Sequence, residues 1–411
     1  HLRDHERSDC QTTGTLVTLD LSNTTVIETL YLDSAEGLQA TLPRWLQARP
    51  LALDTEFIRV DTFYPKIGLI QLGDGQGEGL IDPVAIPNLR MLDALLGPTG
   101  PLKVLHACSE DLEVLTPLTS QGLGTIHDTQ IALAMLGEGL QVGYQKALQL
   151  VLNIEIPKDA SRTDWLQRPL TQHQLDYAAL DVRHLPALYA ELMRRLATRD
   201  LVAIYEAECA EVCRLPAAVI ADTCYQEHGN AWRLSPRELA VLQALMAWRE
   251  REAVARDVPR GHLLKPLSLF ELARRQPRNA AGFHDIPELN PRVARRDGAE
   301  LLALISQARA LADSDLPAPL LPPLPRECSS VYDALKQALG EVAGRLQMPL
   351  DVLWRKRLAD KVVLAAVDTG IASGAARITG WRSPLLSPVV ERVLQNHRDE
   401  LANWSRARKA S

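Results

Sequence analysis

Residues 25–215 alternate between short strand-like runs and helix-like runs, and this alternation constrains the fold more than any other feature of the sequence. The apolar runs KIGLIQL (66–72) and EGLID (78–82) flank a segment rich in glycine and aspartate, which is typical of a β-hairpin. Because strand–helix alternation follows the hairpin, we predict an α/β unit with a mixed sheet flanked by helices. The strand-like runs lie at 25–32, 51–57, 66–72, 78–82 and 103–107, and the helix-like runs at 35–48, 110–119, 128–136, 143–153 and 172–196.

After this block the chain shows only helical patterns. Ser235, Pro236 and Glu238 are typical of a helix start, with a capping serine and a proline at the first helical position. Five prolines between Leu316 and Pro325 cannot continue a helix and indicate a stiff, extended linker. We therefore expect the following organisation: an N-terminal tail at 1–24, the α/β domain at 25–215, a helical domain at 229–310, the linker at 311–327 and a second helical domain at 328–411.

The net charge of −6 hides an asymmetry. Residues 229–310 hold 14 lysines and arginines against 9 aspartates and glutamates, a balance of +5 that leaves −11 for the rest of the chain. A basic module joined to an acidic one suits an enzyme that concentrates carboxylates in one place and binds phosphates in another. Solvated helix faces rich in arginine are the alternative. The candidate phosphate-binding residues are Arg249, Arg251, Arg256, Arg260, Arg274 and Arg275.

Several classes of protein do not fit the composition. A hydrophobic fraction of 46% and a charged fraction of 23% are typical of a globular protein, and no apolar run approaches the length of a membrane span. The first residues are polar and do not resemble a secretory signal. The six cysteines lack the paired spacing of a structural zinc site, so we expect free thiols and a cytoplasmic location.

Two acids stand two residues apart in the run LALDTEF. Residues i and i+2 of a strand project to the same face, so Asp54 and Glu56 would point in one direction. Two like charges side by side are unfavourable unless a cation lies between them. An edge strand with two solvated acids is the alternative, and it is the more common reason for an isolated Asp-x-Glu.

Three further segments supply candidate partners for these acids. Asp111 lies where the run VLHA gives way to a helix that Ser109 can cap, and helix capping alone would explain it. Asp128 has the same ambiguity, and we interpret it as a helix cap. Thr171 and Gln174 form a capping box for a helix that carries Tyr177 and Asp181, four apart and therefore on one face, with a break expected at Pro186.

The order Asp54-x-Glu56, Asp111 and Tyr177-x-x-x-Asp181 is similar to the three exonuclease motifs of the DEDD superfamily, in its tyrosine-bearing branch. The segments ALDTEFIRVDTFYPKIGLIQL, LHACSEDLEVL, HDTQIALAMLG and SRTDWLQRPLTQHQLDYAALDV resemble the ribonuclease D family. The resemblance covers most of residues 30–196. The block 229–310 resembles the HRDC-type helical domain that helicases and this family share, and 328–411 resembles the further C-terminal domain of bacterial members. This resemblance implies a ribonuclease H-like exonuclease domain followed by two all-α domains.

The resemblance also implies an activity and a mechanism. The expected enzyme is a 3′–5′ exoribonuclease that removes nucleoside 5′-monophosphates with the help of two divalent ions, Mg²⁺ or Mn²⁺. In this scheme Asp54 bridges both ions, Glu56 and Asp181 hold the ion on the side of the nucleophile, and Asp111 supports the second ion through water. Tyr177 orients the attacking water, because an unperturbed tyrosine with a pKa near 10 is a poor general base. The expected substrate contacts are Phe57, Ile58, Tyr64, Gln71, His106, Arg162 and Trp165; for His106 and Trp165 ordinary packing is the alternative.

Two other functions compete with this interpretation. A DNA exonuclease of the same superfamily would use the same metal chemistry, since the 2′-hydroxyl contacts that select RNA are not identifiable in the sequence. A non-catalytic RNA-binding protein would be expected to lack at least one carboxylate, and all four are present. We therefore expect an enzyme whose partners are RNAs with a free 3′ end, such as tRNA precursors and small structured RNAs, and which acts as a monomer.

Overall fold

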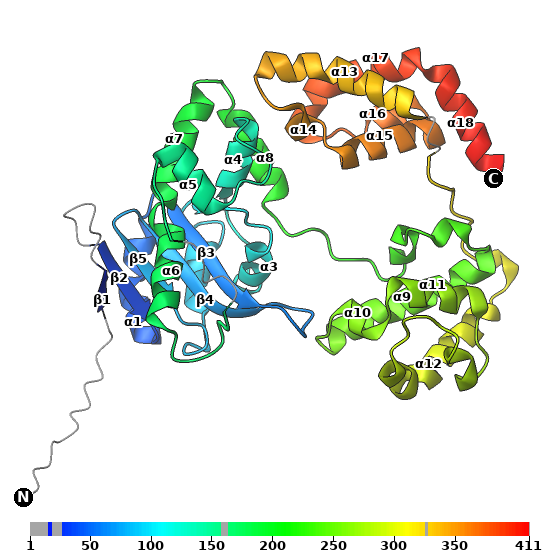
Figure 1. Ribbon diagram of the computed structural model, residues 1–411, viewed down its shortest axis with the longest axis horizontal. Helices are drawn as coiled ribbons and strands as arrows, with labels where there is room; N and C mark the ends of the chain where they lie inside the picture. The colour runs from blue at the N-terminus through cyan, green and yellow to red at the C-terminus, as the bar shows by residue number, and fades with distance from the viewer. Residues whose placement is uncertain (1–14, 19–26, 158–162, 325–327, 411) are drawn as a thin grey trace, which may run out of the picture.

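The computed structural model describes residues 15–18, 27–157, 163–324 and 328–410. Figure 1 shows three parts: an α/β unit that contains the sheet, and two all-helical units that follow it along the chain. The mixed sheet predicted for the first part is confirmed, with seven strands in the order β1-β2-β5-β4-β3-β6-β7. The strands are β1 (Thr15–Thr18), β2 (Ile27–Leu32), β3 (Leu51–Ile58), β4 (Lys66–Gly73), β5 (Gly77–Ile81), β6 (Lys103–Leu105) and β7 (Ile126–Asp128).

The centre of the sheet is an antiparallel meander. β3 pairs with β4 and β4 with β5, as the predicted hairpin requires, while β2 joins β5 in parallel and β6 and β7 extend the other side in parallel. The pairing of β3 with β6 ends at Ala52. Beyond that residue the edge of β3 is therefore free to meet other elements, and Asp54 and Glu56 lie on this portion.

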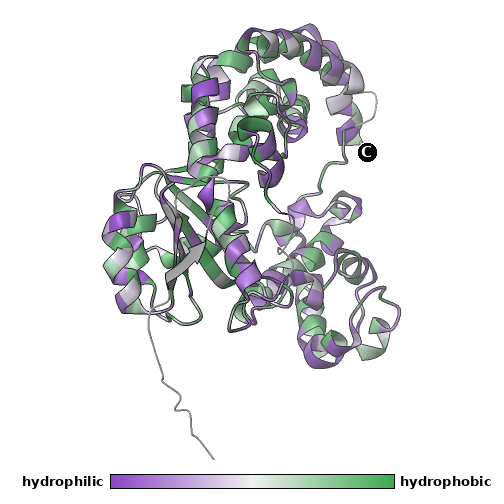
Figure 2. Cartoon of the chain, turned by 60° about the vertical axis from the view of Figure 1, so that its left-hand side comes forward, coloured by the Kyte–Doolittle hydropathy of each residue, from purple (hydrophilic) through white to green (hydrophobic). Residues whose placement is uncertain are grey.

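The helices of the α/β unit cover both faces of the sheet. The long helical run expected at 172–196 is divided at His184, close to the predicted break at Pro186. In Figure 2 green hydrophobic residues follow the strands of the sheet, and the helices alternate between green and purple. The α-helices are α1 (Ala35–Leu46), α2 (Asp93–Leu96), α3 (Asp111–Leu115), α4 (Thr129–Met135), α5 (Tyr144–Leu152), α6 (Gln172–Arg183), α7 (Leu185–Ala197) and α8 (Val202–Val212).

Three details differ from the sequence analysis. Residues 15–18 form β1 and pair with β2, although the segment 1–24 was expected to be a tail; its other residues lie outside the described part of the chain. The short strand β7 was not predicted. Ser109 does not cap α3, since the helix begins at Asp111 and its capping position, Glu110, makes no side-chain cap hydrogen bond.

Each helical unit has its own apolar core, and the two cores share no buried residue. The helix start predicted at Ser235 is confirmed, with a complete capping box to Glu238. Within the linker predicted at 311–327, Asp313–Asp315 form one 3-10 turn and Pro317 to Leu324 form no helix or strand. The α-helices of the first unit are α9 (Pro236–Ala255), α10 (Arg260–Leu263), α11 (Pro266–Arg275) and α12 (Pro291–Arg309); those of the second are α13 (Ser329–Leu346), α14 (Leu350–Leu353), α15 (Lys356–Thr369), α16 (Ile371–Ala375), α17 (Ser383–Asn396) and α18 (Arg398–Ala410).

Both helical units contact the α/β unit. Met348 and Val352 of the second helical unit are buried in the same apolar cluster as α7 and α8. On the other side, the loop between β3 and β4 meets α10, where the Tyr64 amide donates to Asp257 at 2.9 Å and the Arg260 guanidinium lies 4.7 Å from the centre of the Phe63 ring. Within the described residues, no helix is long and apolar enough to cross a membrane.

Candidate active site

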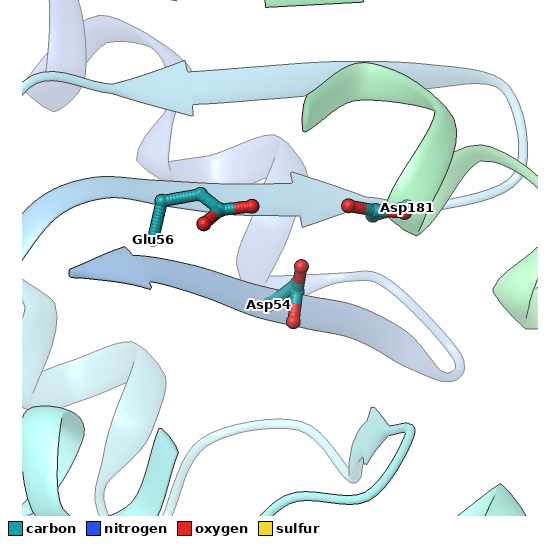
Figure 3. A group of neighbouring side chains, drawn as sticks. All are labelled: Asp54, Glu56 and Asp181. Atoms are coloured by element: carbon teal, nitrogen blue, oxygen red, sulfur yellow. The ribbon is translucent and has the colours of Figure 1, made fainter. Parts of the chain in front are cut away.

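Three carboxylates converge above the central strands. Asp54 and Glu56 project from the same face of β3, and Asp181 reaches them from α6 (Figure 3). One oxygen atom from each of the three lies within 4.8 Å of the others. These are oxygen donors only, which is the ligand type that hard divalent cations such as Mg²⁺ and Mn²⁺ prefer. The site therefore fits a divalent cation, and the predicted grouping of these three acids is present.

Helix α6 is held directly on the sheet. The capping box predicted from Thr171 and Gln174 is formed, with the Gln174 amide bonded to the Thr171 hydroxyl at 3.2 Å. A Cβ atom at Gly73 of β4 would lie only 2.8 Å from the Val182 carbonyl oxygen, so glycine permits this close approach. The helix thereby places Tyr177 and Asp181 over β3, with the Tyr177 hydroxyl close enough to the Asp181 carboxylate to lower its pKa.

Asp111 lies beside the free edge of β3 rather than within the group of three. It is buried at the first turn of α3, and its Oδ1 accepts a hydrogen bond from the Thr55 hydroxyl at 2.5 Å. The loop before it is fixed by Asp128, whose carboxylate accepts from the amides of Ala107 and Cys108, each at 2.9 Å, in addition to capping α4. The prediction that Asp128 caps a helix is confirmed, and this residue also shapes the loop that presents Asp111.

The four acids share an unfavourable electrostatic environment. Burial, followed by the charges of Asp111, Asp181 and Glu56, raises the pKa of Asp54 well above its usual value. Burial and the same kind of repulsion raise the pKa of Glu56 to about 9. Burial also raises the pKa values of Asp111 and Asp181 to about 7, against the lowering effect of hydrogen bonds from Thr55 and Tyr177, respectively. A bound cation would remove this repulsion, because it stabilises the ionised carboxylates.

A β-bulge shapes the end of the site. The register of β3 and β4 shifts between Glu56 and Phe57, so that Glu56 faces Leu69 and Phe57 faces Ile67. Gly68 lies in this irregularity, and a Cβ there would be 2.6 Å from the Trp165 carbonyl oxygen. Arg168 donates to the Gly68 carbonyl oxygen at 2.7 Å, which fixes the bulged segment. The bulge turns the strand beyond Glu56, where the half-buried Phe57 and Ile58 lie at the margin of the carboxylates.

The structure corrects two of the expected substrate contacts. Trp165 is only 1% exposed and packs against Tyr177, with the ring centres 6.2 Å apart. Gln71 is fully buried beneath α6 and is therefore inaccessible to an RNA strand. The half-buried His106 has a structural role, since its ring nitrogens lie 2.8 Å from the Thr129 hydroxyl and the Val142 carbonyl oxygen.

Of the other expected substrate contacts, Phe57, Ile58 and Tyr64 lie in the described part of the chain. Tyr64 is 51% exposed in the loop after β3, and its ring packs edge-on against Phe63 with the centres 5.0 Å apart. Phe57 and Ile58 thus lie at the end of β3, and Tyr64 lies in the loop that follows it. Arg162 lies outside the described residues.

The arginines expected to bind phosphates are mostly paired with acids of their own helical unit. Arg251 is exposed, whereas the other five make ion pairs that neutralise part of the basic surface. The pairs are Arg249–Glu250, Arg256–Glu252, Arg256–Asp297, Arg260–Glu250, Arg274–Glu271 and Arg275–Glu271.

Two residues near the site were not singled out from the sequence. Thr55, between the two acids of β3, donates to Asp111 from the opposite face of the strand. The Tyr144 hydroxyl donates to the Leu180 carbonyl oxygen at 3.3 Å, next to Asp181. The sequence could have indicated Thr55, because it lies between the two acids of the Asp-x-Glu motif. No local pattern marks Tyr144.

Comparisons with known proteins agree with this geometry. Residues 30–197 match the family model described as 3′-5′ exonuclease, and residues 238–305 match the model of the HRDC domain. The fold, the converging carboxylates and these two matches define a 3′–5′ exonuclease that carries an HRDC domain.

Relatives over nearly the full length specify the family. Ribonuclease D of Pseudomonas paraeruginosa is 39% identical over 352 residues, covering 86% of this chain and 94% of that protein. Ribonuclease D of Escherichia coli is 33% identical over 362 residues, covering 87% and 96%. The crystal structure of E. coli RNase D, described as an exoribonuclease involved in structured RNA processing, superposes with a TM-score of 0.82 at 30% identity over 90% of this chain and 99% of that one. The chain belongs to the ribonuclease D family of 3′–5′ exoribonucleases.

Proposed function

We propose that this enzyme removes nucleoside 5′-monophosphates one at a time from RNA 3′ ends with the help of two divalent cations, in the 3′ maturation of tRNA precursors and other small structured RNAs. The observation that carries the proposal is the convergence of Asp54, Glu56 and Asp181 within 4.8 Å, with Tyr177 close to Asp181 and with Asp111 beside them. Bound cations of this kind supply Lewis-acid activation of water and stabilise the departing 3′-oxygen.

Each side chain has a distinct part in this proposal. Asp54, Glu56 and Asp181 would hold the cations, with Glu56 and Asp181 serving the activation of the attacking water, and Asp111 would support the site from the edge of β3. The Tyr177 hydroxyl orients the attacking water as a neutral phenol, because burial and the nearby acids raise its pKa above the usual value.

Recognition of the RNA 3′ end is assigned to the apolar and aromatic side chains that follow Glu56 along the chain. Phe57 and Ile58 contact the terminal nucleotides, and Tyr64 offers an exposed ring on which a base can stack. The relative from E. coli, described as acting in structured RNA processing, supports structured RNAs as substrates. We further propose exonuclease, HRDC-type and second HRDC-like domains at 25–215, 229–310 and 328–411, acting as a monomer in the cytoplasm.

The test is a 3′-end cleavage assay on labelled RNA in Mg²⁺ or Mn²⁺, with wild type and Asp54→Asn compared. Wild type should release 5′-mononucleotides, and both Asp54→Asn and chelation with EDTA should abolish release. Undiminished hydrolysis under either condition would contradict the metal-dependent mechanism. A tRNA-like RNA with a 3′ extension, an unstructured RNA and single-stranded DNA of equal length distinguish the substrates; preference for DNA would favour a DNA exonuclease.

A further inference from the structure

Gln71 is a fully buried amide directly beside the carboxylates. It lies in β4 opposite Asp54 of β3, and opposite Leu80 of β5 on its other side. Residues directly opposite each other in antiparallel strands project to the same face, with Cβ atoms about 5 Å apart. The side chain of Gln71 therefore lies on the face of the sheet that carries Asp54, beneath α6.

Neither polar atom of this amide has a hydrogen-bond partner among the described residues. Its surroundings on the same face are apolar, since Leu69, Leu80 and Ala178 belong to one buried cluster. A buried amide without partners destabilises the fold, and a leucine or methionine would fill the same space without that cost. A polar group in this position, next to a candidate metal ligand, is thus best explained by a role at the metal centre.

The residue directly opposite this amide is Asp54, a candidate metal ligand. A carboxylate that binds a cation keeps lone pairs that accept hydrogen bonds, and carboxylate ligands are commonly held by such outer donors. The Gln71 Nε2 group is a side-chain donor on the neighbouring strand, on the face of the sheet that carries Asp54.

We propose that Gln71 is a positioning residue of the metal centre, whose amide holds the Asp54 carboxylate in its ligand orientation. This inference rests on the proposed metal-dependent function and extends it to a residue that touches neither cation nor RNA.

Gln71→Met tests the proposal, because methionine keeps the length of the side chain and removes the amide. Leu80→Met is the matched control, since it changes the adjacent position of the same buried layer without affecting a polar group. The dissociation constant for Mn²⁺ would be measured by electron paramagnetic resonance of the free ion, and the melting temperature of the metal-free protein by differential scanning calorimetry. Gln71→Met should bind Mn²⁺ about tenfold more weakly, with an unchanged or higher melting temperature, while Leu80→Met should keep wild-type affinity.

Wild-type Mn²⁺ affinity in Gln71→Met would overturn the proposal, and so would an equal loss in Leu80→Met, which would indicate packing alone. Gln71→Leu provides a second apolar replacement; if neither variant folds, the side chain has a packing role and the proposal is wrong. Asp54→Asn separates this result from the proposed function. Loss of Mn²⁺ binding and hydrolysis in Asp54→Asn with normal affinity in Gln71→Met would overturn only the role of Gln71.

Discussion

The carboxylate of Glu208 accepts hydrogen bonds from both terminal nitrogens of the Arg382 guanidinium, at 2.5 and 3.0 Å, although the two residues are 174 positions apart. Glu208 is fully buried in α8 of the α/β unit, and it also accepts from Trp381 at 2.8 Å and from Arg355 at 3.0 Å. Burial alone would raise the pKa of Glu208, but the hydrogen bond and charge of Arg382 hold this pKa below its usual value. This ion pair joins the second helical unit to the unit that contains the active site.

Removal of Arg382 should therefore destabilise the chain strongly. Arg382→Met leaves a buried carboxylate with fewer partners, and we expect a loss of about 3 kcal/mol in the free energy of unfolding, measured by urea denaturation at pH 7. Lys356→Met is the control, since Lys356 pairs with Asp360 while 88% exposed, and its loss should be less than about 1 kcal/mol. Equal and small effects of the two substitutions would show that the buried pair does not hold the units together.

The raised pKa values of the carboxylates predict a pH-dependent metal affinity. Cations bind the ionised acids, and the metal-free protein retains protons on Asp111 and Asp181 up to about pH 7 and on Glu56 up to about pH 9. Metal and protons therefore compete, so the Mn²⁺ dissociation constant should fall as the pH rises from 6 to 8.5, by up to about tenfold per unit for each proton displaced. An affinity that is constant over this range would contradict the electrostatic description of the site.

The local parts of this site were predictable because each depends on short-range physics. The alternation of a strand places Asp54 and Glu56 on one face, and the spacing of Tyr177 and Asp181 places both on one face of α6. The capping box of Thr171 and Gln174 likewise depends only on neighbouring backbone groups. Each of these motifs alone has a structural explanation. We predicted that they form one active site because together they resemble the motifs of the ribonuclease D family.

The parts that failed depend on contacts between distant segments. Trp165 was expected to contact the substrate, with packing as the alternative, and its burial follows from the close approach of its backbone to Gly68 of β4. For His106 the same two alternatives were open, and its hydrogen-bond partner Val142 lies 36 positions later in the sequence. The three-residue strand β7 is too short for any periodicity to be recognised. The pairing of Glu208 with Arg382 likewise has no local signal.

Tyr177 should affect the rate of hydrolysis far more than metal affinity. Tyr177→Phe removes the hydroxyl that orients the attacking water, and we expect roughly a 100-fold lower rate in single-turnover cleavage of RNA at saturating Mn²⁺. Because the hydroxyl also lowers the pKa of Asp181, Mn²⁺ affinity should weaken slightly at pH 7 and less at pH 8.5.

Tyr189→Phe is the control for that substitution, since its hydroxyl bonds His127 at 2.8 Å, away from the carboxylates. The control should cleave RNA at the wild-type rate. A Tyr177→Phe variant with a wild-type single-turnover rate would exclude an orienting role of the phenol.

Tyr64 should contribute to substrate binding rather than to the chemical step. Its ring is held by Phe63 and its backbone amide by Asp257, so an exposed aromatic face is fixed where the loop after β3 meets the first helical unit. Stacking of a nucleobase on such a ring is worth about 1–3 kcal/mol, so Tyr64→Ala should raise KM about tenfold for a single-stranded RNA 3′ end and leave kcat close to that of wild type. Val60→Ala, in the same loop and 69% exposed, is the matched control and should change neither constant. An unchanged KM in Tyr64→Ala would mean that the RNA strand reaches Asp54 and Glu56 by another route, whereas a fall in kcat alone would mean that the loop acts on the carboxylates through β3 and not on the RNA.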